Sequence, residues 1–418
     1  MANNMISFNE HGELLNYWVK KQYQNEFVIY FDQHLDFKKI SEENLKILKS
    51  YSEKNQNMNE LNRDVPFREY ETYPYGLDNF LYAAKELNII DHLIWVYPNN
   101  DYTINDLQKV LITNVSLIAG FKEEVLSSFA INEYSVELSV NHLKIEITNL
   151  KYLSHIKLNK TPLIDIDLDF FYNSNKQQLH LVKEFKEYFL SLGKAWKDDP
   201  TMTYSITSGF LPEKYSYLGE QIADFFEMDI VHHSKLRTES NSITKISYLL
   251  NNNSTYLTSE IIEEVWEKVL VFYSGTGLGV KSLLFSRIGN LELAIQYYDL
   301  AKQNNVNYFW SAYNIGLIYM NQKRYALASH WFLLAEGNLT DSIQTHSLIL
   351  RSICELKQGN FSESLALGIK CADEIGIRAE PYLIIALSCK ELGLIREYKK
   401  NYVLYKTFKS DGLSGVKC

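Results

Sequence analysis

The sequence predicts an α/β domain with a mostly parallel sheet flanked by helices, followed by an all-α helical-repeat domain. Through the first two-thirds of the chain, short apolar runs alternate with amphipathic stretches, which is typical of a parallel sheet covered by helices. From about residue 242 the helical periodicity is continuous. Because 418 residues exceed the usual size of one domain, we place two domains at residues 1–240 and 241–418.

Four apolar runs predict the main strands of the sheet. Each is β-rich, as a strand buried on both faces requires. The runs are FVIYF (27–31), HLIWVY (92–97), PLIDIDLDFF (162–171) and MTYSIT (202–207).

Three other segments predict the elements between these strands. SVELSVNHLKIEIT (135–148) alternates polar and apolar residues, which indicates a half-exposed antiparallel ribbon or an edge strand. DNFLYAAKELNII (78–90) has a helical pattern. Residues 41–71 predict a helix followed by a mobile loop.

Composition excludes several classes of function. The net charge of −9 and the pI near 5.7 disfavour sequence-independent binding to nucleic acid, which depends on a basic surface. No apolar stretch approaches the roughly 18 to 20 residues of a membrane-spanning helix, and the N-terminal residues lack a signal-peptide pattern. The four cysteines show no CxxC spacing. We therefore expect a cytoplasmic protein that binds neither nucleic acid nor membrane.

An internal repeat marks the second domain. The turn-like tetrads GNLE, KRYA, GNFS and GLIR begin at Gly289, Lys323, Gly359 and Gly393, with spacings of 34, 36 and 34 residues. A glycine or basic residue there ends one helix, and the next helix folds back on it. The repeat predicts a series of helical hairpins.

One repeat resembles a tetratricopeptide repeat. The residues that carry the likeness are Gly316, Tyr319, Ala328, Phe332 and Ala335. Ala294 and Ala301, each 34 residues earlier, correspond to Ala328 and Ala335. The alternative is generic helical hairpins with coincidental spacing. Repeats of this kind usually bind peptides or proteins along a concave groove, so a protein partner is expected here.

Acidic residues follow two of the predicted strands. Asp32, His34 and Asp36 come directly after FVIYF, and alternate residues of a strand share one face. The run DIDLD (165–169) repeats this arrangement. Crowded, poorly hydrated carboxylates need a counter-charge, which divalent cations supply. A surface loop entry and an acidic edge strand are the alternatives for the two motifs taken singly.

The ligand types narrow the choice of metal. Imidazole and carboxylate without thiolate suit manganese, magnesium, iron or zinc, and the excess of carboxylate favours manganese. DQHLD and IDIDLD resemble the two metal motifs of the arginase and deacetylase superfamily, which also has a histidine about two dozen residues before the first motif. His11 precedes His34 by 23 residues. The resemblance implies an arginase-like fold and two Mn²⁺ ions held by His11, Asp32, His34, Asp36, Asp165 and Asp167, with Asp32 and Asp165 shared.

Four sequence segments that contain or flank these motifs narrow the resemblance to the peptide arginase family. They are EHGELLNYW, DQHLDF, YPYGLDNFLYAAKELNIIDHLIWVYP and PLIDIDLDFF. Members of known activity hydrolyse arginine side chains in ribosomally made peptides to ornithine and urea. The resemblance covers residues 1–230, not the repeats, and implies a metal-dependent hydrolase that acts on a precursor peptide during its maturation.

Further candidates serve the reaction that this resemblance implies. Asp36 would relay a proton to the leaving amine. Asp169 or Glu213 would pair with the guanidinium, although Asp169 has a loop-capping alternative and Glu213 a solvent-facing one. Asp78 and Asn79 would orient the substrate backbone, or else cap the following helix.

One departure and two other functions stay open. Free-amino-acid arginases carry a histidine shortly after DxHxD, whereas residues 37–71 contain none. This leaves the proton shuttle open and disfavours free arginine as the substrate. A small-guanidine ureohydrolase or deacetylase of the same fold is one alternative. A repeat-based adaptor without turnover is the other.

Overall fold

The computed structural model divides the chain into two units. One contains residues 1–111 and 124–254, the α/β unit, and the other contains residues 112–123 and 255–418, the helical unit. The predicted boundary between residues 240 and 241 lies outside the described residues. The structure describes residues 4–63, 73–118, 121, 129–173, 176–192, 196–233, 258–263, 276–304, 308–336, 342–375 and 378–410.

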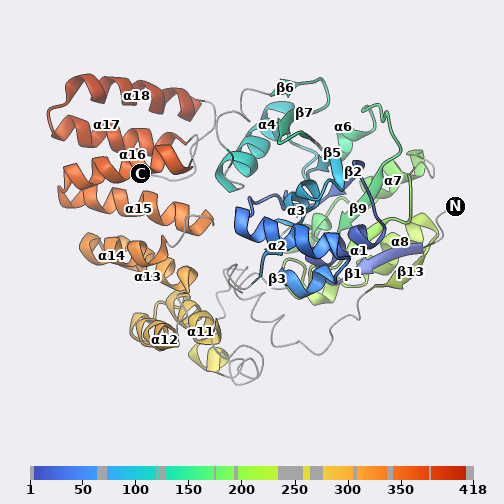
Figure 1. Ribbon diagram of the computed structural model, residues 1–418, viewed down its shortest axis with the longest axis horizontal. Helices are drawn as coiled ribbons and strands as arrows, with labels where there is room; N and C mark the ends of the chain where they lie inside the picture. Colours follow the sequence, from blue (N-terminus) through green and yellow to red (C-terminus); the bar gives the residue numbers. More distant parts are fainter. Residues whose placement is uncertain are drawn as a thin grey trace. The chain divides into compact units, whose positions relative to one another are not determined.

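A mostly parallel sheet forms the centre of the α/β unit (Figure 1). Among the described residues it has nine strands, of which the first seven in spatial order are parallel and the last two antiparallel. The order is β13 (Asp229–His232), β1 (Asn4–Phe8), β12 (Thr201–Thr203), β9 (Leu163–Asp167), β2 (Glu26–Phe31), β5 (Ile90–Val96), β8 (Leu143–Thr148), β7 (Val136–Val140) and β6 (Ala130–Ile131). The predicted α/β class with a parallel sheet is confirmed.

The four predicted strands are present, with two differences in length. β9 ends at Asp167, and the rest of its apolar run forms the 3-10 helix η3 (Leu168–Phe171). β12 covers only the start of its run. The alternating segment became the hairpin of β7 and β8, whose turn residues Asn141 and His142 have φ of 49° and 67°. β1 and β13 were not predicted, because each apolar run is short.

Helices and short elements complete the α/β unit. Ser41 caps the predicted helix after β2 by accepting a hydrogen bond from the Asn44 backbone N–H. A loop was predicted between this helix and residue 71, but its described part contains the 3-10 helix Met58–Leu61, with Met58 buried, and a short strand at Asn62–Arg63; residues 64–72 lie outside the described residues. The helices are α1 (Gly12–Lys20), α2 (Glu42–Glu53), η1 (Met58–Leu61), α3 (Phe80–Glu86), α4 (Ile104–Ile112), α6 (Leu150–Leu153), α7 (Val182–Leu192), η4 (Glu213–Tyr215) and α8 (Leu218–Phe226). The π-helical turn η2 (Thr113–Ile118), which follows α4 in the chain, belongs to the helical unit. The short strand pairs are β3 (Asn62–Arg63) with β4 (Tyr75–Gly76), and β10 (Tyr172–Asn173) with β11 (Gln178–Leu179).

The two faces of the sheet differ in polarity. Under α7 and α8, strand residues such as Ile29, Ile94 and Ile166 pack against Phe185 and Phe226 in one continuous apolar core. The opposite face meets α1 and α3, and it carries polar side chains at the carboxyl ends of β2, β9 and β12. The apolar face packs against helices and forms the core, so a functional site is expected on the face that carries the buried polar side chains.

Four helical hairpins form most of the described part of the helical unit, which also contains residues 113–118 and 258–263. Their helices are α11 (Thr276–Arg287), α12 (Leu291–Gln303), α13 (Phe309–Asn321), α14 (Tyr325–Ala335), α15 (Ser342–Gln358), α16 (Phe361–Ile375), α17 (Ala379–Glu391) and α18 (Ile395–Ser410). The first residue of each repeated tetrad lies in the turn between paired helices with positive φ: Gly289 77°, Lys323 59°, Gly359 83° and Gly393 74°. The predicted all-helical second part of the chain is confirmed.

Small residues allow the hairpin helices to pack closely. A Cβ built on Gly316 of α13 would lie 2.7 Å from the Phe332 ring of α14. Ala294, Ala301 and Ala328 are fully buried. The first helices of successive hairpins, α11, α13, α15 and α17, lie beside one another, as stacking of repeats requires.

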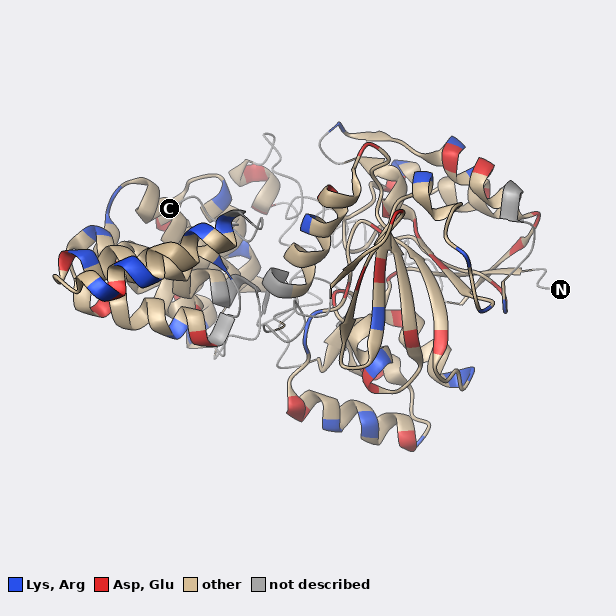
Figure 2. Ribbon diagram, turned by 90° about the horizontal axis from the view of Figure 1, so that it is seen from above, with Lys and Arg blue, Asp and Glu red and all other residues tan. Residues whose placement is uncertain are grey.

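Charge and hydropathy are distributed without extremes. Figure 2 shows Lys and Arg interspersed with Asp and Glu on the described residues of each unit. Within that part of the chain, no helix combines the length and the apolar character needed to cross a bilayer.

Candidate metal centre

The predicted metal ligands gather at the carboxyl edge of the parallel sheet. Asp165 and Asp167 lie on β9 and face α1 and α3, with Tyr30 of β2 in register beside Asp165. Thr201 and Thr203 of β12 are in register with the same two aspartates. Because neighbouring parallel strands end at one edge, residues far apart in sequence become neighbours here.

His11 reaches this edge from the turn between β1 and α1. It is the residue before the first turn of α1, and its ring stacks on Phe80 of α3 at a centroid distance of 4.9 Å. The preceding residue, Glu10, accepts a 2.8 Å hydrogen bond from the Ser208 backbone N–H, and burial raises the pKa of Glu10 to about 8. These contacts hold the His11 ring over the cluster.

A loop, rather than a strand, presents the DxHxD residues. β2 ends at Phe31, so strand alternation, which the sequence predicted, does not bring these side chains together. Instead the chain turns, with φ of 45° at Asp36, a strained value for a residue other than glycine. Trp95 Nε1 donates to the Asp32 carbonyl at 2.9 Å, and the His34 backbone N–H donates to Asp32 Oδ1 at 2.6 Å.

One group of possible ligands is buried, and we call it the inner group. It consists of His11, Asp32 and Asp36. His11 Nδ1 lies 3.2 Å from Asp32 Oδ2 and 3.3 Å from Asp36 Oδ2. Atoms that share a cation at about 2.0–2.2 Å are separated by about 3.0–3.4 Å, so the inner group has the spacing of a cation site.

A second group opens to solvent, and we call it the outer group. It consists of Asp32, His34 and Asp169. His34 Nδ1 lies 3.4 Å from Asp32 Oδ1 and 3.3 Å from Asp169 Oδ2. The His34 side chain is 45% exposed, against 2% for His11. Phe210 lies beside the His34 ring at a centroid distance of 4.8 Å, so access to the outer group passes these two rings.

Asp165 and Asp167 lie in the cluster but outside both groups. Asp167 Oδ2 lies 3.1 Å from His11 Nδ1 and accepts a 2.6 Å hydrogen bond from the Ser205 hydroxyl, while its Oδ1 accepts from the Asp169 backbone N–H at 2.9 Å. Asp165 accepts from Thr201 at 2.6 Å and lies 3.3 Å from His11 Nε2. The ligand set drawn from the resemblance therefore differs from this geometry in two ways: Asp169 stands beside His34 in place of Asp167, and Asp165, which the resemblance makes a shared ligand, belongs to neither group.

Electrostatics set the cluster apart from an ordinary polar patch. Burial raises the pKa of Asp167 and of Asp169, and neighbouring carboxylates add to both shifts. Burial and the Asp32 charge raise the pKa of Asp36 to about 6. Burial opposes ionisation of Asp32, but contacts with both histidines outweigh it and lower the pKa of Asp32. Desolvation would lower the pKa of His11, yet the carboxylates, Asp167 foremost, raise it well above its usual value.

Several buried polar atoms of the cluster lack a hydrogen-bond partner among the described residues. They are His11 Nε2, Asp165 Oδ2 and both carboxylate oxygens of Asp169; apart from the 3.3 Å ion pairs of His11 with Asp165 and of His34 with Asp169, no donor or acceptor in the described part of the chain is in hydrogen-bond geometry with them. Buried polar atoms are nearly always satisfied in native proteins, and a carboxylate without donors is costly. Divalent cations would satisfy these atoms, so the donor set fits the metal ions that the sequence indicated.

The other predicted site residues lie outside the two groups. Asp78 pairs with Lys38 at 2.9 Å, and Asn79 is buried with its side-chain oxygen accepting from the Gly76 backbone N–H at 2.8 Å. Asn79 stands before α3 without a side-chain cap hydrogen bond. Glu213 is exposed on η4 and, among the described residues, forms no ion pair with the cluster. Their proposed roles stay predictions.

Sequence reasoning missed the residues that support the cluster. Tyr30, Thr201, Ser205 and Glu10 hydrogen-bond to it or to the loops that hold it. Tyr30 had a usable signal, because it stands two residues before Asp32 at the end of a strand. Thr201 and Ser205 had none, because only the pairing of β12 with β9 brings Thr201 to Asp165 and only the loop after β12 brings Ser205 to Asp167.

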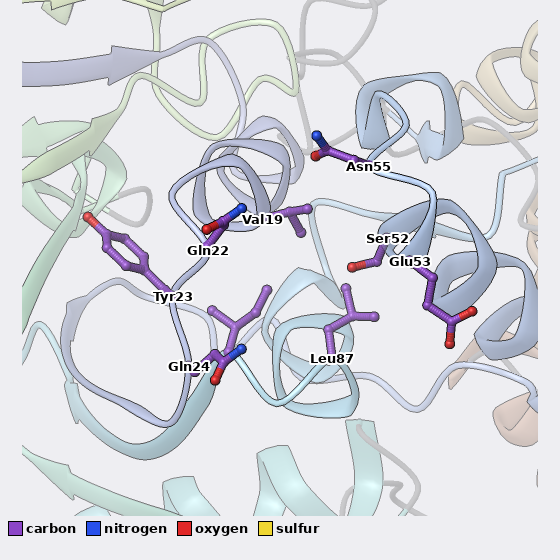
Figure 3. A pocket seen from close by; sticks show the side chains of 9 residues that line it. Val19, Gln22, Tyr23, Gln24, Ser52, Glu53, Asn55 and Leu87 are labelled. Carbon is purple, nitrogen blue, oxygen red and sulfur yellow. The ribbon is translucent and has the colours of Figure 1, made fainter.

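A pocket lies at the other end of the sheet (Figure 3). It is formed by the ends of α1, α2 and α3, near the starts of β2 and β5, and among its lining residues are Val19, Gln22, Gln24, Glu53, Asn55 and Leu87. It holds a single carboxylate and no histidine. Its lining offers no grouping of ligands or acid–base residues comparable with the metal cluster.

Fold and site together define an α/β protein with a carboxylate- and histidine-rich candidate metal centre at the carboxyl edge of its sheet. No model of a known protein family matches the chain, and no curated protein and no solved structure matches it.

Proposed function

We propose that the chain is a metal-dependent hydrolase of arginine side chains in peptides, giving ornithine and urea, with an arginase-like α/β unit and two Mn²⁺ ions. The observation that carries the proposal is the convergence of two histidines and five aspartates at one sheet edge, with spacings of 3.2–3.4 Å inside the inner and outer groups. The motif resemblance supplies the reaction class.

The residues that would hold the ions follow from the two groups. His11, Asp32 and Asp36 would hold one, and Asp32, His34 and Asp169 the other, with Asp32 shared. Bound divalent cations supply Lewis acidity and lower the pKa of a coordinated water. Carboxylate and imidazole donors suit manganese.

The chain's own charges favour a cationic substrate. The cluster contains five aspartates, which carry one negative charge more than two divalent cations balance. A guanidinium group carries one positive charge, and in a poorly hydrated site this complementarity is worth more than in water. The exposed His34 with Phe210 marks the open side from which a side chain would enter.

Asp36 is our candidate for proton transfer. As a carboxylate of the inner group, it would stand close enough to the reacting groups to relay a proton to the departing amine. Its Oδ2 lies 2.9 Å from the Tyr30 hydroxyl. The two candidate partners of the guanidinium differ in position: Asp169 belongs to the outer group, and Glu213 is exposed on η4.

We assign peptide or partner binding to the helical unit, as a tetratricopeptide-like array. The tandem hairpins with side-by-side first helices support this role, because such arrays present an extended binding surface. A precursor peptide is the expected partner.

The deciding experiment uses the full chain with Mn²⁺ and an arginine-containing peptide. Mass spectrometry should detect the mass loss that accompanies conversion of arginine to ornithine. Asp32→Asn should abolish conversion, because Asp32 is common to both groups, and Asp224→Asn, at an exposed position on α8, should keep it. Free arginine, agmatine and acetyl-lysine are run in parallel. Turnover of one of these alone would redirect the proposal to another C–N hydrolase, and metal binding without any turnover would favour the adaptor.

A further inference from the structure

The hydroxyl of Tyr30 occupies an unusual place in the cluster. It donates a short hydrogen bond to Asp32 Oδ2, lies 2.9 Å from Asp36 Oδ2 and lies 3.4 Å from His11 Nδ1. These three atoms are the ligand atoms that the inner group would offer to a cation. One phenolic oxygen is therefore in hydrogen-bond range of every atom that would bind the inner cation.

The side chain has little freedom to leave this place. Tyr30 is fully buried on β2, between β5 and β9. Its ring lies against His11 and Phe80, at centroid distances of 5.4 and 6.1 Å. Close packing of this kind holds a side chain in one rotamer.

A cation at the inner group and the present position of the hydroxyl are in competition. Each ligand atom would lie about 2.0–2.2 Å from a bound cation. The same three atoms now lie within hydrogen-bond distance of the Tyr30 hydroxyl. A cation at the inner group would therefore compete with the hydrogen bond from Tyr30 to Asp32 Oδ2, and the phenolic oxygen would have to shift within a packed core to make room.

The outer group is engaged less fully: no side-chain hydroxyl among the described residues donates to its ligand atoms, and the 2.6 Å hydrogen bond from the His34 backbone N–H leaves Asp32 Oδ1 a lone pair for a cation. Both carboxylate oxygens of Asp169 are without a hydrogen-bond partner there, and Asp32 contributes Oδ1 to this group, not the Oδ2 that Tyr30 contacts. His34 is also the more exposed histidine. The outer group is thus ready for a cation as it stands.

We infer that Tyr30 sets the order in which the centre fills: its hydroxyl competes with a divalent cation for the inner group, so the outer group binds first and the inner group more weakly. This inference rests on the proposed metal centre. The Tyr30 hydroxyl therefore lowers the affinity of the inner group for a divalent cation.

The test is a Mn²⁺ titration of the full chain by calorimetry, with wild type, Tyr30→Phe and Tyr75→Phe. Tyr75 is the matched control, because it is also fully buried and its hydroxyl donates to the backbone carbonyls of Gly12 and Met58 at 3.0 and 3.1 Å. Wild type should show one tight and one weaker site. A hydrogen bond to a charged group changes an equilibrium constant about tenfold to a hundredfold, so Tyr30→Phe should tighten the weaker site by about that factor, and Tyr75→Phe should leave both sites unchanged.

A thermal-shift measurement with and without Mn²⁺ keeps the test independent of any loss of stability. The rise in Tm caused by Mn²⁺ should be larger in Tyr30→Phe than in wild type, whatever the starting Tm, and unchanged in Tyr75→Phe. Weaker or unaltered binding in Tyr30→Phe would overturn the role of Tyr30 while leaving the metal centre intact. Absence of Mn²⁺ binding in all three proteins would overturn the metal centre itself.

Discussion

The sharpest prediction concerns which aspartate completes the outer group. The family resemblance implies Asp167, whereas the geometry puts Asp169 beside His34 with an Nδ1–Oδ2 separation of 3.3 Å. Asp167 is already engaged by the Ser205 hydroxyl and the Asp169 backbone N–H. Asp169→Asn should therefore cost one Mn²⁺ ion, and Asp167→Asn should not.

The size of the effect follows from the number of ligands. Complete sites with four protein ligands bind zinc with apparent free energies of about 10–16 kcal/mol, or about 3 kcal/mol for each ligand. At about 1.4 kcal/mol for each factor of ten, loss of one carboxylate weakens binding about 100-fold to 1,000-fold. In Asp167→Asn the amide oxygen can still accept from the Asp169 N–H, so a change below about tenfold is expected.

The assay counts bound manganese. Free Mn²⁺ gives a paramagnetic resonance signal that bound Mn²⁺ loses, so titration of each variant yields the number of sites and their affinities. Wild type and Asp167→Asn should bind two ions, and Asp169→Asn one. Equal losses in both variants, or a greater loss in Asp167→Asn, would refute the assignment of Asp169 and favour the ligand set implied by the resemblance.

Three further predictions test the centre and the repeats. Chelation should lower the Tm of the full chain, and added Mn²⁺ should restore it, because the cluster's carboxylates lose their counter-charge; an unchanged Tm would contradict the centre. Lys323→Gly should stabilise α13 and α14 by about 0.5–1 kcal/mol in amide hydrogen exchange, because Lys323 has a φ of 59° that glycine adopts without strain. Gly289→Ala should destabilise its hairpin by about 1–2 kcal/mol, because Gly289 has a φ of 77° and the added Cβ meets nothing within 4 Å, so that only backbone strain changes. If both variants were stabilised, or both destabilised, this account would be contradicted. Gly316→Ala should cost about 1–3 kcal/mol by urea unfolding followed on α13 and α14, because the added Cβ would lie 2.7 Å from the Phe332 ring, and no measurable cost would show that the helices separate freely.

Local patterns in the sequence were sufficient for most of the fold. FVIYF and HLIWVY became β2 and β5 because buried parallel strands leave a wholly apolar signature. The spacing of the tetrads located four turns, and Lys323 takes the same positive φ as the three glycines. β1 and β13 escaped because neither is a wholly apolar run: β1 contains Asn4 and Ser7, and β13 contains Asp229 and His232, so pairing with their neighbours in the sheet defines them.

The sequence predicted which residues come together at the site, but it did not predict the backbone conformation that brings the DxHxD residues together. His11, although 21 residues before Asp32, does meet it. The DxHxD residues, however, leave the strand after Phe31 and gather through a turn at Asp36, which periodicity does not reveal. Side-chain alternation describes strands only, so it fails where the strand ends.

The sequence by itself determined which residues are available for the metal chemistry and that they follow buried strands, since residue type and apolar periodicity are local properties of the chain. Tertiary structure alone decided the grouping: β9 ends at Asp167 and η3 turns Asp169 toward His34, while the pairing of β2 with β9 sets the Tyr30 hydroxyl among the inner donors. The physical reason is that distances of 2 to 4 Å between atoms depend on where each strand stops and what packs beside it, and this information is spread over the whole chain.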